Sequence, residues 1–247
     1  IDVAKVTASS GQISANLTGT GNLSKSGTGT LILGGNNSHS GGTTVMSGTL
    51  VLDSATATGV GTITLAGGTL DLSSRTVSNS VSLSSDSTVT ATDGAIAGDI
   101  AGSGQLSKTG NGTVTLSGNN TYAGGTTVSA GTLALNSANS LGSGNVTLAG
   151  GGLDVKSQTV AKDITLTADS RVAGTDGTIS GVISGDRLLT KVGVGTLTLS
   201  GINTFTGGTL INAGTLEVTG SILGNVVVSA GGMLAGSGNV GDITVVA

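Results

Sequence analysis

The 247-residue chain contains no cysteine, no proline and no tryptophan, and it has one tyrosine, one phenylalanine and one histidine. Without cysteine, a small disulfide-stabilised scaffold is excluded. Without proline and without glycine at every third position, collagen is excluded as well. Charged residues make up only 9% of the chain and its formal net charge is −4, whereas disordered chains usually combine low hydropathy with high net charge. These absences leave a folded domain of unusual composition.

Basic residues are also scarce. The nine lysines and arginines are scattered without a basic run, so we expect no nucleic-acid partner and no binding to an anionic membrane. No apolar stretch approaches the roughly 20 residues of a membrane helix, so we expect no direct membrane insertion of this segment. The first residues lack the basic and apolar regions of a signal peptide, which places any export signal outside this chain.

Glycine is abundant, at 46 residues, and threonine, serine, valine and leucine make up much of the remainder. Valine and threonine favour strands, while glycine and serine favour tight turns. The composition therefore predicts an all-β protein.

A long internal repeat dominates the sequence. The segments LSKSG at 23–27, LSKTG at 106–110 and LTKVG at 189–193 show its period, and two consecutive 83-residue blocks match at about half of their positions without a gap. A fixed period of this kind indicates a solenoid, whose units share one continuous core. We predict a single solenoid segment over 1–247, which consists of the end of a truncated repeat (1–19), two full repeats (20–102 and 103–185) and a shortened final repeat (186–247).

A finer period divides each repeat. The segments GTLIL at 29, GTLVL at 48, GTLDL at 68 and STVTA at 87 begin at nearly equal steps, about four to each long repeat. Apolar residues alternate with polar or mixed ones in these segments, as in strands with one buried face. Glycine pairs and asparagines between them suit sharp corners. The pattern predicts a parallel β-helix of about 12 coils with about 21 residues per coil.

One motif recurs in a fixed order: a lysine, glycines, paired asparagines, an aromatic residue and a GTLxL strand. It is seen in KTGNGTVTLSGNNTYAGGTTVSAGTLAL (108–135) and in GTLTLSGINTFTGGTLINAGTLEV (195–218). These segments resemble the autotransporter-associated β-strand repeat of bacterial type V secretion passengers. The resemblance implies a right-handed β-helix that is exported across the outer membrane and displayed on the cell surface. It also implies an outer-membrane translocation barrel in the full-length protein.

His39 is the one histidine, and a catalytic triad or a metal centre built on histidine would need it. Its place in the repeat favours a different role, because His39, Tyr122 and Phe205 occupy one position of the motif, each a full repeat after the one before. We therefore expect a flat ring that packs over a loop. The chain also lacks a nucleophile elbow, a phosphate-binding loop and an HExxH motif. We predict no catalytic residue, no cofactor and no metal site.

Carboxylates are the next candidates, because glycosidases use two carboxyl groups about 5 to 9.5 Å apart. Asp86 and Asp93 recur as Asp169 and Asp176 with the same spacing of seven, and Asp99 lies close by in the sequence. Asp-Gly turns at 93–94 and 176–177 explain this pattern without a substrate. A polysaccharide-active enzyme is therefore the third hypothesis.

Lys25, Lys108 and Lys191 could form a line of positive charge. Four coils separate neighbouring lysines, which is roughly 19 Å at the usual strand spacing. This separation exceeds the Debye length of about 8 Å in physiological salt. We therefore expect isolated, solvated lysines.

Two further surface motifs are open to a simple structural interpretation. Leu153-Asp154-Val155 matches a short integrin-binding tripeptide, but Leu70-Asp71-Leu72 stands at the equivalent position, which favours an aspartate on a strand face. Thr-x-Thr pairs suggest an ice-binding grid, but other residues occupy the outward position in the remaining GTLxL strands. The pairs are Thr62 and Thr64, Thr88 and Thr90, Thr113 and Thr115, and Thr196 and Thr198.

The leading hypothesis from the sequence is a structural stem of a secreted surface protein. Such a stem holds an effector or adhesive region away from the membrane and assists export by folding outside the cell. The alternative is an adhesin or self-association module that contacts a host surface, a glycan or a neighbouring copy through weak multivalent contacts.

Overall fold

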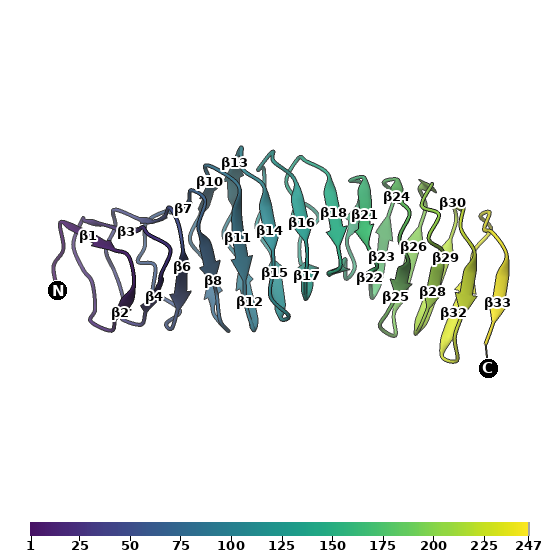
Figure 1. The fold of residues 1–247 in the computed structure, drawn as a ribbon, viewed down its shortest axis with the longest axis horizontal. Coiled ribbons are helices and arrows are strands. Elements are labelled where there is room, and N and C mark those ends of the chain that lie inside the picture. The colour runs from purple at the N-terminus through teal and green to yellow at the C-terminus, as the bar shows by residue number, and fades with distance from the viewer. Residues whose placement is uncertain (247) are drawn as a thin grey trace. The chain divides into compact units, whose positions relative to one another are not determined.

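The computed structural model describes residues 1–246, and the regular elements in this range are all β-strands. Contacts divide the chain into two compact units, with residues 1–126 and 139–144 in unit 1 and residues 127–138 and 145–246 in unit 2. Strand β16 (Thr126–Val128) lies at the boundary between them. Within each unit the strands stand side by side as the chain winds through successive coils (Figure 1).

Unit 1 contains three parallel sheets, because each coil contributes up to three strands that pair with those of the next coil. The first sheet consists of β1 (Lys5–Ala8), β3 (Asn22–Lys25), β5 (Thr43–Val45), β7 (Ile63–Leu65), β10 (Val81–Leu83) and β13 (Ile100–Gly102). The second consists of β2 (Gly11–Ile13), β4 (Thr30–Leu33), β6 (Thr49–Leu52), β8 (Thr69–Asp71), β11 (Ser87–Thr90) and β14 (Leu106–Lys108). The third consists of β9 (Thr76–Val77), β12 (Asp93–Ile96) and β15 (Thr113–Leu116).

Unit 2 repeats this organisation. One sheet consists of β18 (Val146–Ala149), β21 (Ile164–Ala168) and β24 (Ile183–Gly185). Another consists of β17 (Thr132–Leu135), β19 (Gly152–Asp154), β22 (Ser170–Ala173), β25 (Leu189–Lys191), β28 (Thr209–Ile211), β31 (Val226–Val228) and β33 (Ile243–Val245). The remaining strands are β20 (Thr159–Val160), β23 (Asp176–Ile179), β26 (Thr196–Leu199), β29 (Gly214–Val218) and β32 (Gly232–Ala235), and the short pair β27 (Ile202–Asn203) and β30 (Ser221–Ile222).

The pairing register confirms the predicted parallel β-solenoid. Thr30 pairs with Thr49, which pairs with Thr69, so that successive coils repeat at the short period seen in the GTLxL segments. The chain makes about 13 turns, which lie about 19 residues apart. The coils are therefore slightly shorter and more numerous than the sequence pattern predicts. The right-handed sense stays a prediction.

The core follows from the alternation seen in the strand sequences. Leu31, Leu50 and Leu70 occupy matched positions in successive coils, and all three are buried. Each such leucine contributes roughly 1.5–3 kcal/mol relative to an exposed side chain. Because every coil places its leucines over those of the preceding coil, stacking buries apolar surface that one coil could not bury alone.

Glycine is required at the corner that precedes the GTLxL strands. Gly48 and Gly214 adopt positive φ angles of 65° and 66°, which side chains with a Cβ rarely adopt. A Cβ at Gly48 would also lie 2.4 Å from the carbonyl oxygens of Gly27 and Gly29. The recurring glycines thus allow close approach between successive corners.

Candidate functional site: a repeated buried polar cluster

The three repeated lysines are buried, and the prediction that they are solvated is wrong. Lys25, Lys108 and Lys191 are among the largest fully buried side chains of the protein. Each stands at the end of a strand, in register with a buried valine of an adjacent coil (Val45, Val89 and Val172), and its side chain reaches the following corner. The charge therefore lies inside the stack of coils, and no line of positive charge forms on the surface.

Backbone carbonyls replace water around the buried ammonium groups. The Nζ of Lys25 donates to the carbonyls of Ser26, Gly27 and Ser47 at 2.9, 2.7 and 2.9 Å, the last of these in the next coil. The Nζ of Lys108 donates to the carbonyls of Thr109 and Gly110, both at 2.8 Å.

Lys191 repeats the arrangement of Lys25 in the third repeat. Its Nζ donates to the carbonyls of Val192, Gly193 and Ala213 at 3.0, 2.8 and 3.1 Å. In the first and third repeats the ammonium thus joins the corner of its own coil to the corner of the following one. Burial lowers the pKa of all three lysines, and it lowers the pKa of Lys108 to about 8.

A buried asparagine bridges three successive coils in each repeat. The Oδ1 of Asn203 accepts from the amide of Ile183 at 2.9 Å, and its Nδ2 donates to the carbonyls of Gly201 and Ser221. Asn37 accepts from the Leu17 amide and donates to the Ala57 carbonyl in the same way. Asn120 makes the matching bonds to the Ile100 amide and the Ser140 carbonyl.

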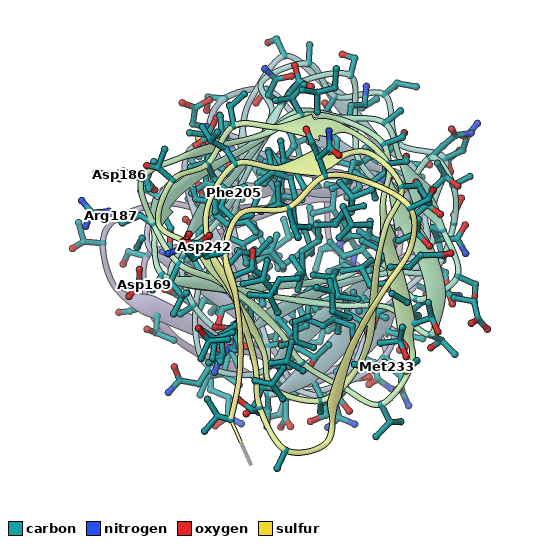
Figure 2. All side chains as sticks on the ribbon, turned by 90° about the vertical axis from the view of Figure 1, so that its right-hand side faces the viewer. Asp169, Asp186, Arg187, Phe205, Met233 and Asp242 are labelled. Carbon is teal, nitrogen blue, oxygen red and sulfur yellow. The ribbon has the colours of Figure 1, made fainter. Side chains whose placement is uncertain are left out.

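The aromatic slot lies two positions after the bridging asparagine. His39, Tyr122 and Phe205 are all buried, as expected for a packing position, and Phe205 lies inside the ring of the coil in Figure 2. The His39 Nε2 lies 3.2 Å from the Thr43 Oγ1, and the Tyr122 hydroxyl lies 2.6 Å from the Thr126 Oγ1. Phenylalanine has no such group, and the buried Thr209 Oγ1 beside it has no hydrogen-bond partner.

These buried groups form one unit, which we call the repeat cluster: the lysine, the asparagine, the ring and the threonine four positions after it. Sequence reasoning identified the ring but missed the asparagine and the threonine. A signal was present, because both residues recur unchanged in all three copies while about half of the other positions differ. The asparagines, Lys25 and Lys191 bond to backbone groups of neighbouring coils, so the cluster holds coils together.

The candidate aspartates bind backbone at corners. Asp86 accepts from the amide of Gln105 at 2.8 Å, and its equivalent Asp169 accepts from the amide of Leu188 at 3.0 Å. Asp99 accepts from the amide of Asn119 at 2.7 Å. Each of these bonds joins one coil to the next coil along the chain. These three carboxylates therefore act as corner caps.

The other two aspartates differ from the expectation. Asp93 and Asp176 do not form Asp-Gly turns but open strands β12 and β23, where both are exposed. The glycine after Asp93 is buried, and a Cβ at Gly94 would lie 2.7 Å from the Leu72 Cβ. Close packing against the preceding coil thus explains this Asp-Gly pair.

The tripeptide Leu153-Asp154-Val155 is part of the core wall. Leu153 and Val155 are buried, and the Asp154 Oδ1 accepts from the amide of Lys156 at 2.9 Å. Asp71 makes the equivalent bond to the amide of Ser73 at 2.8 Å. The tripeptide is therefore a strand-face aspartate between two inward side chains, as predicted.

The surface pockets next to Asp71 and Asp154 contain few side chains that could act in catalysis. One lies beside Asp71 and is lined also by Thr90 and Asn111, and another lies between Asp154 and Arg171. Each contains one carboxylate, whereas glycoside hydrolysis needs two. Across residues 1–246, no three histidine, cysteine or acidic side chains come together as a metal site would require. The same range contains no helix that could cross a membrane.

Comparison with known proteins gives two matches. The family model of the passenger-associated transport repeat matches at residues 23–52, 106–135 and 189–218. The extracellular serine protease of Serratia marcescens is 48% identical over 59 residues, which is 24% of this chain and 6% of that protein. No solved structure matches the chain.

The three family matches coincide with the three copies of the repeat cluster, since each begins close to the buried lysine and ends after the GTLxL strand. They confirm the resemblance seen in the sequence and the expected location at the cell surface. The chain therefore contains three passenger-associated transport repeats on a β-solenoid, and in this it is similar to secreted autotransporter passengers.

Proposed function

We propose that the segment is a non-enzymatic stem that holds a distal effector or adhesive region away from the outer membrane. The observation that carries this proposal is the repeat cluster. Its buried asparagine hydrogen-bonds to the backbone of neighbouring coils in each repeat, and its buried lysine does so in the first and third repeats. A stem requires a rigid stack of coils and does not require a binding or catalytic site. The hydrogen bonds between coils make the stack rigid. Coils lie about 19 residues apart, so residues 20–102 span slightly more than four coils. Parallel strands stack about 4.8 Å apart, so one repeat adds roughly 21 Å of reach.

In this proposal, the stacking of coils also assists export of the chain. Each coil that folds outside the cell buries the leucines of the coil before it and completes the carbonyl shell of its lysine. Folding outside the cell thereby biases translocation of the chain outward, and an outer-membrane barrel in the full-length protein is the expected exit.

Exchange of one repeat for another tests the stem. In the full-length protein, residues 20–102 are replaced by a second copy of residues 103–185, which has the same length but differs at about half of its positions. A stem predicts unchanged surface display and unchanged activity of the distal region. Loss of that activity at normal display levels would show that residues 20–102 contain a specific site.

An adhesin or self-association module is the second candidate, and one observation favours it. Thr30, Thr49, Thr69, Thr88 and Ser107 form a column of register partners on one outer face of unit 1. The neighbouring outward column is mixed, with Ile32, Val51, Asp71 and Thr90, so hydroxyls form a single line and no two-dimensional grid.

The hydroxyl column allows repeated weak contacts with a glycan or with another copy of the protein. Replacement of Thr30, Thr49, Thr69 and Thr88 by valine separates the two candidates. An adhesin predicts loss of cell aggregation or host-cell binding at equal surface display. The stem predicts that both are unchanged.

A further inference from the structure

The aromatic slot of the first repeat contains a titratable ring, whereas the same slot holds tyrosine and phenylalanine in the other repeats. His39 is buried, and Thr43, four positions later, faces its Nε2 at 3.2 Å. The Thr43 hydroxyl donates its own proton to the Thr58 carbonyl at 3.0 Å. Thr43 must therefore accept from His39, which places the imidazole proton on Nε2.

This tautomer leaves Nδ1 without a proton, in a buried position and without a hydrogen-bond partner. Gly59 of the next coil lies directly over the ring, because a Cβ at this position would be 2.8 Å from Nδ1. Protonation of His39 would thus create a buried N–H donor and a positive charge with no acceptor beside it. A buried polar group in that state costs about 1–3 kcal/mol, and a charged one costs more.

The coils on either side of His39 offer no compensating charge. The His39 amide donates to the Leu17 carbonyl, and the His39 carbonyl accepts from the Val60 amide, so residues 17–21 and 57–61 are its neighbours. Neither segment contains a titratable side chain. The buried charge of the same coil is Lys25, which is a cation, and its ammonium is already held by the carbonyls of Ser26, Gly27 and Ser47. Within residues 1–246, neither ring nitrogen has an ion-pair partner.

We propose that His39 is an acid-sensitive latch: its protonation releases the coil around residues 37–61 from the stack, while the equivalent coils at Tyr122 and Phe205 stay closed. The stem would then loosen at one defined coil when the surrounding medium becomes acidic. The other two slots cannot respond in this range, since tyrosine titrates near pH 10 and phenylalanine does not titrate.

The direction of the effect follows from proton linkage. Burial lowers the pKa of His39 below the ordinary value of 6.5 that applies to the unfolded chain. Between the two pKa values the open coil binds a proton that the closed coil does not bind, so the closed coil loses stability as the pH falls. The stabilising effect of neutral His39 is complete above pH 6.5 and decreases below it, by up to tenfold in the opening equilibrium per pH unit.

Hydrogen exchange of the whole chain between pH 7.5 and 5 tests the latch. The reporters are the amides of Ser40 and Val60, which bond to the Gly19 and His39 carbonyls, and the matched amides of Ala123 and Ser143 in the second repeat. After correction for intrinsic exchange rates, protection of Ser40 and Val60 is expected to fall below pH 6.5, by up to tenfold per pH unit, while protection of Ala123 and Ser143 stays constant.

The chain supplies its own control variants. His39→Phe and His39→Tyr place the residues of the other repeats in this slot and should abolish the pH dependence at Val60, and Tyr122→His should transfer it to Ser143. The latch is overturned if protection of Val60 in the unchanged chain is independent of pH, or if His39→Phe and His39→Tyr lose protection to the same extent. Either result would leave the proposed stem untouched, because the stem does not depend on pH.

Discussion

A buried lysine whose ammonium group is held by backbone carbonyls is the most unusual residue of this protein. Removal of an ammonium group from water costs several kcal/mol, even after relaxation. Hydrogen bonds that involve a charged group contribute about 1.5–3 kcal/mol each, so three of them offset a cost of this size. Lys25 and Lys191 have three carbonyl acceptors each, and two of these belong to the corner that follows the lysine in sequence. The corner must therefore fold correctly before the lysine can be buried.

Amine labelling tests this burial directly. In the native protein an amine-reactive reagent should modify the exposed Lys5 and leave Lys25, Lys108 and Lys191 unmodified, because the reagent cannot reach a buried Nζ. After unfolding in denaturant, all four should react. Mass spectrometry of the peptides measures the outcome, and modification of Lys25 or Lys191 at the rate of Lys5 in the native protein would show that they are solvated.

The aromatic slot predicts a stabilising substitution. Phe205→Tyr would give the orphaned Thr209 Oγ1 the partner that Tyr122 gives to Thr126 in the second repeat. We expect a gain of about 1 kcal/mol, the usual net value of a buried hydrogen bond. Hydrogen exchange of the amides around residue 205 measures the gain. The reverse change, Tyr122→Phe, should cost a similar amount, and a loss on Phe205→Tyr would mean that the slot has no room for the hydroxyl.

At the scale of the element, the buried asparagine side chain joins the corners of neighbouring coils by hydrogen bonds, as backbone hydrogen bonds join their strands. The Asn203 amide contacts the preceding coil at Ile183 and the following coil at Ser221, so one side chain holds the register of three coils. A parallel sheet has no turn that fixes its register, and a slip by one residue would expose the inward leucines. The asparagine therefore specifies the stacking as well as stabilising it.

Loss of this bridge should be costly. Asn203→Ala leaves the Ile183 amide and the Gly201 and Ser221 carbonyls without their side-chain partner, at about 1–3 kcal/mol for each buried group that stays unpaired. We expect a destabilisation of about 2–4 kcal/mol, measured by urea denaturation together with exchange of the Ile183 amide. The matched control is the exposed Asn111→Ala, for which a change within about 0.5 kcal/mol is expected. Equal effects of the two substitutions would contradict the bridging role.

The positions of the strands could be predicted, because the alternation of apolar and polar residues that defines a strand is visible in a few consecutive residues. Leu31 and Leu33 alternate with Thr30 and Ile32, and this period alone locates β4 and its inward face. The role of Lys25 could not be predicted in this way. A lysine at the end of a strand normally reaches solvent, and nothing local shows that Ser47, in the next coil, presents a carbonyl to its ammonium. The prediction of a turn at Asp93-Gly94 was wrong for the same reason. The glycine is required by close packing against Leu72 of the preceding coil and not by a turn.

At the scale of the whole molecule, the repeat is the structural unit. Each copy contributes the same buried lysine, asparagine and ring position, and the surface residues change between copies. Selection for a specific ligand would instead preserve the residues of one surface site. The buried residues could then be exchanged for other apolar residues. The repeat therefore fits a segment whose length and stiffness matter more than any one surface residue.

In-frame deletion of residues 20–102 from the full-length protein is the most direct test of the stem. The deletion joins residue 19 to residue 103, which occupies the position of residue 20 in the repeat, so the coil register is preserved. The measurement compares the distal region's activity on a soluble ligand with its activity on a ligand fixed to an opposing surface, at equal surface display. The stem predicts full activity on the soluble ligand and a reach that shortens by roughly 21 Å, and duplication of the repeat should restore or extend that reach. Loss of activity on the soluble ligand would contradict the stem and place a specific site within the deleted repeat.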